Sequence, residues 1–378
     1  MRDSIYEKSD LIRMTREPLD MQYQRIMSKV MEAMMWTNGD IVLCFSGGKD
    51  SALLLDFYCD IVRMFKKQDQ TIKVAWANTT NETKAMREFV PWFIDRCESM
   101  YGVTIHLDEV KPLNGDNIIT VMRREGLPLV SKNVASTVRK VSTDMEKNGV
   151  AYDDIKHLHK STVMCRDALR EMGLSDTTVL AMTGWSCKRN DFGKSFILPL
   201  RWMPLLNIKN AIGKDIRLSE KCCFYLKKEP ISRLNYPNIM TGEQAVESKY
   251  REFAWLKHGC NYRLPDNSVK SKPLGAVSLD AVLYSIYRRN IPLCSDYGEV
   301  VYCDESRCYK CSKSQRTGCA LCGFGIDYDP HRFVRLQETE PAKVSAAFKP
   351  FEKGGLGYLE ACEYLNEYCK TKIEIPQI

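Results

Sequence analysis

The sequence predicts an α/β fold in which a parallel twisted sheet is flanked by helices. Apolar runs with strand character alternate with amphipathic helical patterns, and a polar, glycine-rich loop joins the first strand to the next helix. The expected strands are 41–45, 72–77, 103–107, 178–182 and 238–241, and helical patterns at 51–66 and 82–101 separate the first three. Strands separated by helices favour a parallel sheet, whose ligands bind beyond the carboxyl ends of the strands.

The first forty residues predict a helical lead-in to this sheet. Apolar side chains recur at helical spacing, and Asn38-Gly39 marks the end of the element. The positions that make up this stripe are Met21, Ile26, Val30, Ala33 and Met34. Because Met fills cores readily, we expect these methionines to pack in a core.

Composition limits the kind of protein. The chain has 378 residues, 44% of them hydrophobic and 27% charged, which is typical of a globular protein of one or two domains. No apolar run approaches the roughly 18 residues of a membrane span, and the first residues lack a signal-peptide pattern, so we expect a cytoplasmic location and no membrane partner.

The formal net charge of +7 fits an anionic nucleotide and would also suit nucleic acid. Sixteen cysteines in such a chain indicate thiols and metal ligation.

The strongest local signal is the loop after the first strand. Its sequence is Ser46-Gly47-Gly48-Lys49-Asp50-Ser51. Adjacent glycines allow consecutive N–H groups to face one concavity, and the following helix turns its N-terminal dipole toward the same place. The two serines add hydroxyl groups and Lys49 adds a cation, so the loop suits a phosphate or sulfate. The spacing differs from that of a Walker loop, and a plain glycine-rich turn is the alternative interpretation.

The loop resembles the PP-loop of the adenine-nucleotide alpha-hydrolase-like superfamily. Within it, the chain most resembles the phosphoadenosine phosphosulfate (PAPS) and adenylyl sulfate (APS) reductase family, with matching pieces from the loop to about Cys322. The resemblance implies a Rossmann-like fold and an enzyme of sulfur chemistry that acts on ATP, APS or PAPS, with Mg²⁺ as a candidate companion. It also implies a thiol reductant or sulfur donor as a partner.

Further pieces resemble the nucleotide site of that family. The stretch containing Asn78 and Thr79 follows the second strand, where polar side chains can contact a base or ribose, although a helix cap explains the same residues. Lys132 lies in a Gly-x-Pro-x-x-Ser-Lys segment and is a candidate anion contact or a plain surface lysine. Gly242 and Arg251 lie in a Gly-x-x-x-x-Glu-Ser-x-x-Arg element, in which Gln244 replaces an arginine of the family. Arg251 suits an anion contact, and it could equally pair with Glu247 one helical turn away.

The cysteine pattern predicts a metal centre. Cys222-Cys223 stand among three lysines, and adjacent thiolates suit a metal or a cluster of negative charge better than a mutual disulfide. Together with Cys319-x-x-Cys322 they resemble the ligands of the [4Fe-4S] cluster in APS reductases. A zinc site made by Cys308, Cys311, Cys319 and Cys322 is the alternative, with Cys303 and Cys260 as spare thiols.

The end of the chain departs from the family. True sulfonucleotide reductases carry a nucleophilic cysteine in a Glu-Cys-Gly-[Ile/Leu]-His tail, which this sequence lacks. Cys362 lies in an amphipathic helical pattern that favours packing, and Cys369 lies near two lysines. These two thiols are the candidate nucleophiles, and the catalytic residue stays undetermined.

The expected organisation has three parts. Residues 1–40 are the lead-in, 41–268 the nucleotide-binding domain with an insertion at about 141–215, and 269–378 a helical, cysteine-rich, metal-binding region. Three functions remain open. They are sulfonucleotide reduction, ATP-dependent sulfur insertion into nucleic acid or another acceptor, and nucleotide-dependent regulation by a non-catalytic protein with structural zinc.

Overall fold

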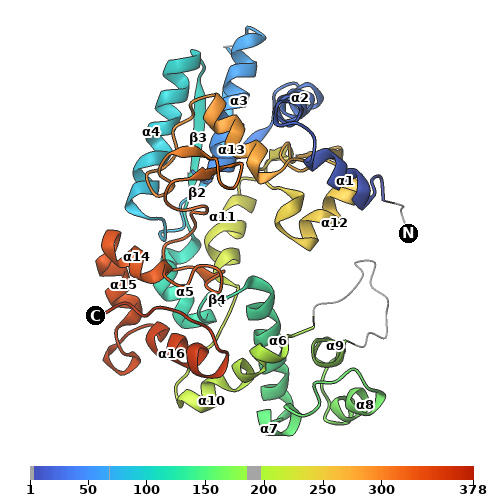
Figure 1. Ribbon diagram of the computed structural model, residues 1–378, viewed down its shortest axis with the longest axis vertical. Coiled ribbons are helices and arrows are strands. Elements are labelled where there is room, and N and C mark those ends of the chain that lie inside the picture. Colours follow the sequence, from blue (N-terminus) through green and yellow to red (C-terminus); the bar gives the residue numbers. More distant parts are fainter. Residues whose placement is uncertain (1–3, 68, 185–196) are drawn as a thin grey trace. The chain divides into compact units, whose positions relative to one another are not determined.

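The computed structural model describes residues 4–67, 69–184 and 197–378 (Figure 1). These residues form two compact units. The first unit comprises Met1–Asn78, Glu82–Lys111 and Glu229–Gly318, and the second comprises Thr79–Asn81, Pro112–Lys228 and Cys319–Ile378. The chain therefore crosses from one unit to the other several times, unlike the expected division at residues 40 and 268. The expected insertion at 141–215 falls within the second unit, and its residues 185–196 lie outside the described part.

The first unit contains the predicted parallel sheet. Its strands, in spatial order, are β3 (Ile105–Val110), β2 (Ile72–Ala77), β1 (Val42–Cys44), β5 (Ile239–Met240), β7 (Val269–Ser271) and β6 (Asn261–Arg263). Neighbouring strands are parallel except for β6 and β7, which pair antiparallel. The order runs from β1 to β3 on one side and continues with β5 on the other. The carboxyl end of β1 is therefore the point where the direction of the strand order reverses, which is the usual ligand site of such sheets.

Helices complete the first unit. They are α1 (Lys8–Thr15), α2 (Leu19–Thr37), α3 (Lys49–Met64), α4 (Lys84–Tyr101), α11 (Glu229–Ser232), η4 (Ala245–Glu247), α12 (Lys249–His258) and α13 (Leu279–Arg288). Helix α3 packs against α2, α4 and α13, and nearly all of its side chains are buried (Figure 1). Most of its circumference is apolar and covered by these neighbours, and its buried polar residues include Asp56 and Asp60. An antiparallel hairpin of β8 (Val300–Cys303) and β9 (Cys308–Cys311) follows α13.

A buried charge network fixes α3 in this core. Asp56 of α3 is 1% exposed and forms an ion pair with Arg289, which also reaches Asp60 at 3.0 Å. The hydroxyl of Tyr101 donates to Asp56 at 2.7 Å. Since a buried charge is tolerated only when it is paired, these contacts are mutually dependent.

The second unit is mainly helical. Its elements are η1 (Leu113–Gly115), α5 (Ile118–Glu125), β4 (Leu129–Val130), α6 (Lys132–Asn148), α7 (Tyr152–Ile155), α8 (Val163–Glu171), α9 (Asp176–Thr183), η2 (Leu200–Asn207), α10 (Ile208–Ile212), η3 (Phe224–Lys228), β10 (Gly323–Phe324), α14 (Arg332–Thr339), α15 (Pro341–Phe348), η5 (Phe351–Lys353) and α16 (Tyr358–Tyr368). Strands β4 and β10 pair parallel, which joins the middle of the chain to its last quarter. A single apolar core includes side chains from both of these parts.

Several local predictions can be compared directly with these elements. The lead-in is helical, and Asn38 ends α2 in the left-handed conformation with φ 49°, as expected at Asn38-Gly39. Met21, however, is 53% exposed, so this methionine is not a core residue. The strand expected at 103–107 begins and ends later, at Ile105–Val110.

The strand expected at 178–182 is wrong, because these residues belong to helix α9. The helix begins after Ser175 as its N-cap and ends at Gly184, which adopts φ 73°. These two helix-boundary signals outweigh the strand preference of its β-branched residues. Most of the Gly-Trp-Ser-Cys stretch that follows, from residue 185 on, lies outside the described part. Among the described residues, no helix has the length and apolar character that a membrane crossing requires.

Candidate functional site

The loop that follows β1 turns at Gly47 and leads directly into α3. Gly47 adopts φ 74°, and a Cβ added to it would lie 2.3 Å from the Met86 sulfur and 2.9 Å from a methyl carbon of Val90. Only glycine fits there without displacing α4. Gly48 is the N-cap of α3. Because it has no side chain, the N-cap residue cannot itself accept a hydrogen bond from the first N–H groups of the helix.

Hydroxyl groups hold the loop in shape from within. The Ser46 N–H donates to the Ser51 hydroxyl at 3.2 Å, and the Gly48 N–H lies 3.3 Å from the Ser46 hydroxyl. Ser51 in turn donates to the Gly48 carbonyl at 2.9 Å and is only 4% exposed. Ser51 is therefore a buried part of the loop, whereas Ser46 is exposed, so a ligand could also reach its hydroxyl.

Lys49 and Asp50 neutralise each other at the start of α3. The Lys49 ammonium lies 2.9 and 3.0 Å from the two Asp50 carboxylate oxygens, and Lys49 is 5% exposed. An anion on this loop would consequently be held mainly by backbone N–H groups and the helix N-terminus. Gly242, at the end of β5, contacts this region, since its Cβ would lie 3.0 Å from Asp50.

Tyr297 is a residue of this site that sequence reasoning did not single out. Its hydroxyl accepts from the Lys49 N–H at 3.3 Å and from the Thr317 hydroxyl at 2.7 Å, and the side chain is 3% exposed. The hydroxyl oxygen thus occupies a position on the N–H groups of α3 that an anionic oxygen could take. The Tyr297-Gly298 dipeptide lay in a segment matched to the reductase family, but nothing in the sequence alone placed it at the loop.

The remaining predicted nucleotide contacts have partners within their own units. Asn78 ends β2 and donates to Glu109 at 2.8 Å, within the first unit. Thr79 is fully buried in the second unit, with its hydroxyl 3.9 Å from the Cys319 sulfur. Arg251 forms an ion pair with Glu247 one turn earlier, which is the structural alternative considered for it.

The four predicted cluster ligands lie around one small pocket of the second unit. Its lining residues are Asn81, Ile118, Pro128, Cys222, Cys223, Leu226, Lys227, Cys319 and Cys322. Its volume is about 20 Å³, so the thiols are close together. In the described part of the chain, no three His, Cys, Asp or Glu side chains converge as ligands of a metal ion in their present positions. A Cys₄ cluster has several iron atoms, so its thiolates need not converge on one point.

The pocket has the electrostatics of a thiolate site. A hydrogen bond from the Cys222 thiol, together with the Lys132 and Lys227 ammonium groups, lowers the pKa of Cys223. The same hydrogen bond and burial raise the pKa of Cys222, so a proton stays on one sulfur of the pair in the metal-free state. Lys132 therefore lies beside Cys223, where it can stabilise a negative charge, and not in the unit that carries the loop.

Asn81 is a second residue that sequence reasoning overlooked. Its carbonyl accepts from the Ala320 N–H at 2.6 Å, and its side-chain oxygen accepts from the Leu321 N–H at 3.2 Å. It thereby holds the Cys319–Cys322 turn. Among the described residues, its amide nitrogen is buried without a hydrogen-bond partner, and Asn81 lines the cysteine pocket. A buried donor without a partner is costly, and an anionic sulfur in the pocket would satisfy it.

The other cysteines lie elsewhere. Cys308 and Cys311 belong to β9 of the first unit, where Cys311 is buried and Cys308 is half-buried. Cys260 is buried and accepts from the Trp255 indole at 3.4 Å. The pocket therefore unites the cysteines of the predicted cluster and does not include the first pair of the zinc alternative.

Both candidate nucleophiles are buried in the core of the second unit. Cys362 is 0% and Cys369 1% exposed. Burial raises the pKa of Cys362, and it raises the pKa of Cys369 to about 12. Both thiols are therefore protonated and shielded at neutral pH, which is the packed state that the helical pattern of Cys362 favoured.

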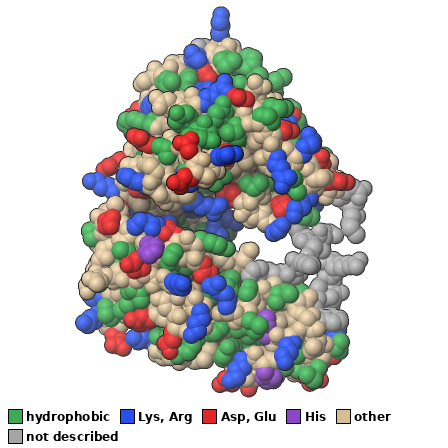
Figure 2. Space-filling model, viewed as in Figure 1, with side chains coloured by type: hydrophobic (Ala, Val, Ile, Leu, Met, Phe, Trp, Pro, Cys, Tyr) green, Lys and Arg blue, Asp and Glu red, His purple; other side chains and the backbone are tan. Residues whose placement is uncertain are grey.

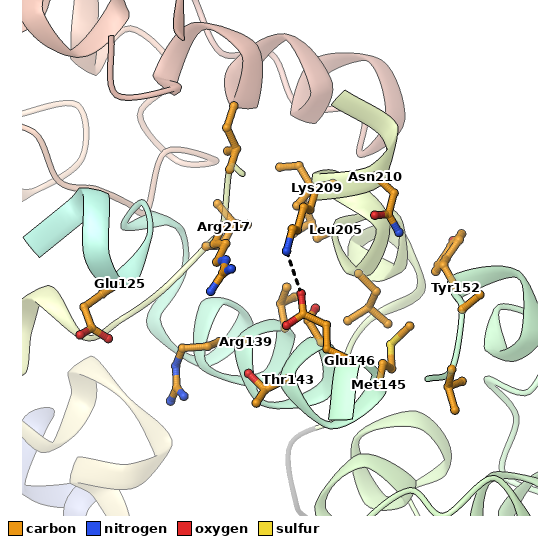
Figure 3. A pocket seen from close by; sticks show the side chains of 18 of the residues that line it. Glu125, Arg139, Thr143, Met145, Glu146, Tyr152, Leu205, Lys209, Asn210 and Arg217 are labelled. Carbon is orange, nitrogen blue, oxygen red and sulfur yellow. Dashed lines mark hydrogen bonds and ion pairs between the residues drawn. The ribbon is translucent and has the colours of Figure 1, made fainter. Parts of the chain in front are cut away.

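A larger cavity of about 490 Å³ lies within the second unit, lined by α5, α6, α7, η2, α10 and residues 216–218 (Figure 3). Figure 3 shows Lys209 reaching across to Glu146, and their charged groups are 3.3 Å apart. The other cations of its lining are likewise paired, namely Arg124 with Asp116, Arg139 with Glu220, and Arg217 with Asp215.

On the face drawn in Figure 2, basic and acidic side chains are interspersed, in keeping with the modest net charge.

Known proteins resemble this chain in structure, whereas the sequence comparisons find no match. No protein-family model matches the chain, and no curated protein sequence matches it. Sheet order and loop geometry therefore carry the fold assignment, which agrees with the predicted α/β class. The chain is similar to the crystal structure of a phosphoadenylyl-sulfate (PAPS) reductase from Candida auris in a phosphate complex, at 12% sequence identity over 74% of this chain and 89% of that chain, with a TM-score of 0.32.

Proposed function

We propose that the chain is an enzyme of sulfur chemistry that binds an adenine nucleotide at the Ser46–Ser51 loop and holds a [4Fe-4S] cluster on Cys222, Cys223, Cys319 and Cys322. The observation that carries this proposal is the pocket in which two cysteine pairs, far apart in sequence, meet beside two lysines and an unpartnered amide. A plain helical core has no need of such an arrangement, because it would keep two lysines and a buried, unpartnered amide donor beside four cysteines with nothing bound to satisfy them.

The loop supplies the nucleotide part of the proposal. The loop lies at the carboxyl end of β1, turns at the left-handed Gly47 and leads into the N-terminus of α3. In this position, its backbone N–H groups could bind a phosphate or sulfate. Tyr297 would donate its hydroxyl hydrogen to the bound anion when it gives up its contact with the Lys49 N–H. Asn78, which follows β2, and Gly242, two residues after β5, are the proposed neighbours of the adenosine.

The cysteine pocket supplies the cluster part. When bound, a [4Fe-4S] cluster supplies a redox-active, charged centre. Lys132 and Lys227 would offset the charge of the thiolates, and Asn81 would donate its amide hydrogen to a sulfur atom. Asn81 would also keep Cys319 and Cys322 in position through its contacts with the Ala320 and Leu321 N–H groups.

Sulfonucleotide reduction is the first candidate reaction, and it needs a thiolate that attacks sulfur. Cys362 and Cys369 are buried and protonated, so the proposal assigns the electrons to an external thiol reductant. The same observation favours the second candidate, ATP-dependent sulfur insertion into nucleic acid or another acceptor, because that reaction needs no nucleophilic tail in this chain.

An activity assay with paired substrates separates the two reactions. The anaerobically purified chain is incubated with APS or PAPS and a dithiol reductant, and sulfite is measured. In parallel it is incubated with ATP, a sulfide donor and an acceptor nucleic acid, and AMP and pyrophosphate are measured. Sulfite release alone supports reduction, and acceptor-dependent AMP formation alone supports insertion. If neither product forms while a nucleotide binds, the enzyme proposal is wrong.

A further inference from the structure

The β8–β9 hairpin of the first unit carries two cysteines in facing positions. Cys303 ends β8, Cys308 begins β9, and the two are direct partners in the antiparallel register. The Cα atoms of such partners lie about 4.5 to 5.5 Å apart, within the range of about 4.4 to 6.8 Å that a disulfide spans. Only four residues connect them, the last of which is Arg307 at φ 49°. The register therefore places the backbone of Cys303 and Cys308 within the range that a disulfide spans.

The polar surroundings of the pair favour a thiolate on Cys303. The Lys310 ammonium lies 3.1 Å from the Cys303 sulfur, and the Cys308 thiol donates to the Ser306 hydroxyl at 3.2 Å. Hydrogen bonds from Ser306, with the help of Lys310, lower the pKa of Cys303 to about 7. Both cysteines are partly exposed, so a solvent-borne reagent can reach them.

Cys311 does not share this arrangement. Successive side chains of a strand point to opposite faces, so Cys308 and Lys310 share one face of β9 and Cys311 lies on the other. Cys311 is 4% exposed and belongs to the apolar core of the first unit. The Cys308-x-x-Cys311 spacing therefore spans two faces, whereas the pair that meets on one face is Cys303 with Cys308.

We propose that Cys303 and Cys308 form a thiol–disulfide exchange site whose substrate is a disulfide, either a small molecule or a protein. The Cys303 thiolate attacks one sulfur of the substrate disulfide, forms a mixed disulfide and releases the other half as a thiolate. Cys308 loses its proton to solvent and attacks the Cys303 sulfur, which releases the second half. Two electrons pass from the pair to the substrate, and the hairpin is left with a Cys303–Cys308 disulfide. Neither cysteine belongs to the loop or lines the cysteine pocket proposed above.

Peptide mapping tests the proposal on the intact chain. The protein is treated anaerobically with oxidised glutathione, alkylated and digested with trypsin, which cleaves after Arg307 between the two cysteines. We expect peptides 290–307 and 308–310 to remain joined, with fragment ions that place the bond on Cys303 and not on Cys294, and to separate after dithiothreitol. The link should vanish in Cys303→Ser and persist in Cys311→Ser.

A rate measurement adds an independent readout. Lys310→Met should slow the reaction of Cys303 with oxidised glutathione at pH 7 several-fold, whereas Lys313→Met, a change of the same type beyond β9, should leave it unaltered. The proposal is overturned if both cysteines are alkylated in full after oxidation, or if the bond joins a different pair. It is equally overturned if the purified chain holds zinc that both Cys303→Ser and Cys308→Ser release.

Discussion

Replacing Gly47 by Ala tests the loop most sharply, because the structure gives the cost of the added methyl group. A side chain at φ 74° costs about 1–2 kcal/mol in the left-handed region. The new Cβ would also lie 2.3 Å from the Met86 sulfur and 2.9 Å from Val90, and such overpacking costs about 1–3 kcal/mol. We therefore expect the free energy of unfolding to fall by about 2–5 kcal/mol, with the loop displaced from its present path.

Gly102→Ala is the matched control for this change. Gly102 ends α4 at φ 62°, and nothing lies within 4 Å of an added Cβ. This variant should lose only the conformational part, about 1–2 kcal/mol. Urea denaturation measures both losses, and titration calorimetry with ATP, APS and PAPS measures nucleotide affinity at a temperature where each variant is folded.

The two variants should differ in affinity more clearly than in stability. A displaced loop no longer aims its N–H groups at one point, so folded Gly47→Ala should bind nucleotide at least about tenfold more weakly, which corresponds to a loss of about 1.4 kcal/mol of binding free energy. Gly102→Ala should bind as the unaltered chain does. If folded Gly47→Ala binds every nucleotide as tightly as Gly102→Ala, the loop is not the anion site and the reasoning fails.

The remaining predictions concern the thiols, Asn81 and the buried charges. In Asn81→Asp, a carboxylate replaces the unpartnered amide donor of the cysteine pocket. The iron content after anaerobic purification should therefore fall, while circular dichroism shows that the fold persists. Full retention of iron would contradict the role given to the amide. Cys362→Ala and Cys369→Ala should leave turnover within about twofold, because both thiols are buried and protonated; a complete loss of turnover in a variant that still folds would make that cysteine the nucleophile. Arg289→Met leaves Asp56 buried without its ion pair, so it should lower the free energy of unfolding by about 3–5 kcal/mol, measured by urea denaturation. A loss below about 1 kcal/mol would argue against the network. Alkylation of Cys303 by iodoacetamide should accelerate as the pH rises and level off above about 7, because only the thiolate reacts and its pKa is lowered to that value; a rate that still rises steeply above pH 8 would contradict this.

The fold class and the loop were predictable because short, contiguous patterns determine them. Two adjacent glycines after an apolar strand allow the backbone to turn sharply, and Gly47 adopts a left-handed conformation at this turn. Likewise, the apolar stripe around Cys362 indicated packing before the structure showed that thiol to be buried. Residues 178–182 were predicted wrongly because their β-branched residues favour a strand, and the helix boundaries at Ser175 and Gly184 outweigh this weak preference.

The partners that complete each site could not be predicted from the sequence. Tyr297 reaches the loop from a segment far along the chain, and Asn81 reaches the Cys319–Cys322 turn in the same way. No local periodicity encodes such contacts, because they depend on how distant segments pack. The division into two units could not be predicted for the same reason. Each unit is built from several separate segments of the chain, and tertiary contacts, not a change in composition, determine which segments belong together.

Iron and acid-labile sulfide analysis of the anaerobically purified chain tests the central claim most directly. The account predicts iron and sulfide in a ratio near one, with a broad visible absorption band, in the unaltered chain and in Cys308→Ser. Cys223→Ser and Cys319→Ser should lose both elements, because each removes a thiolate of the pocket. Stoichiometric zinc without iron, or iron that is retained in Cys223→Ser and lost in Cys308→Ser, would contradict the account.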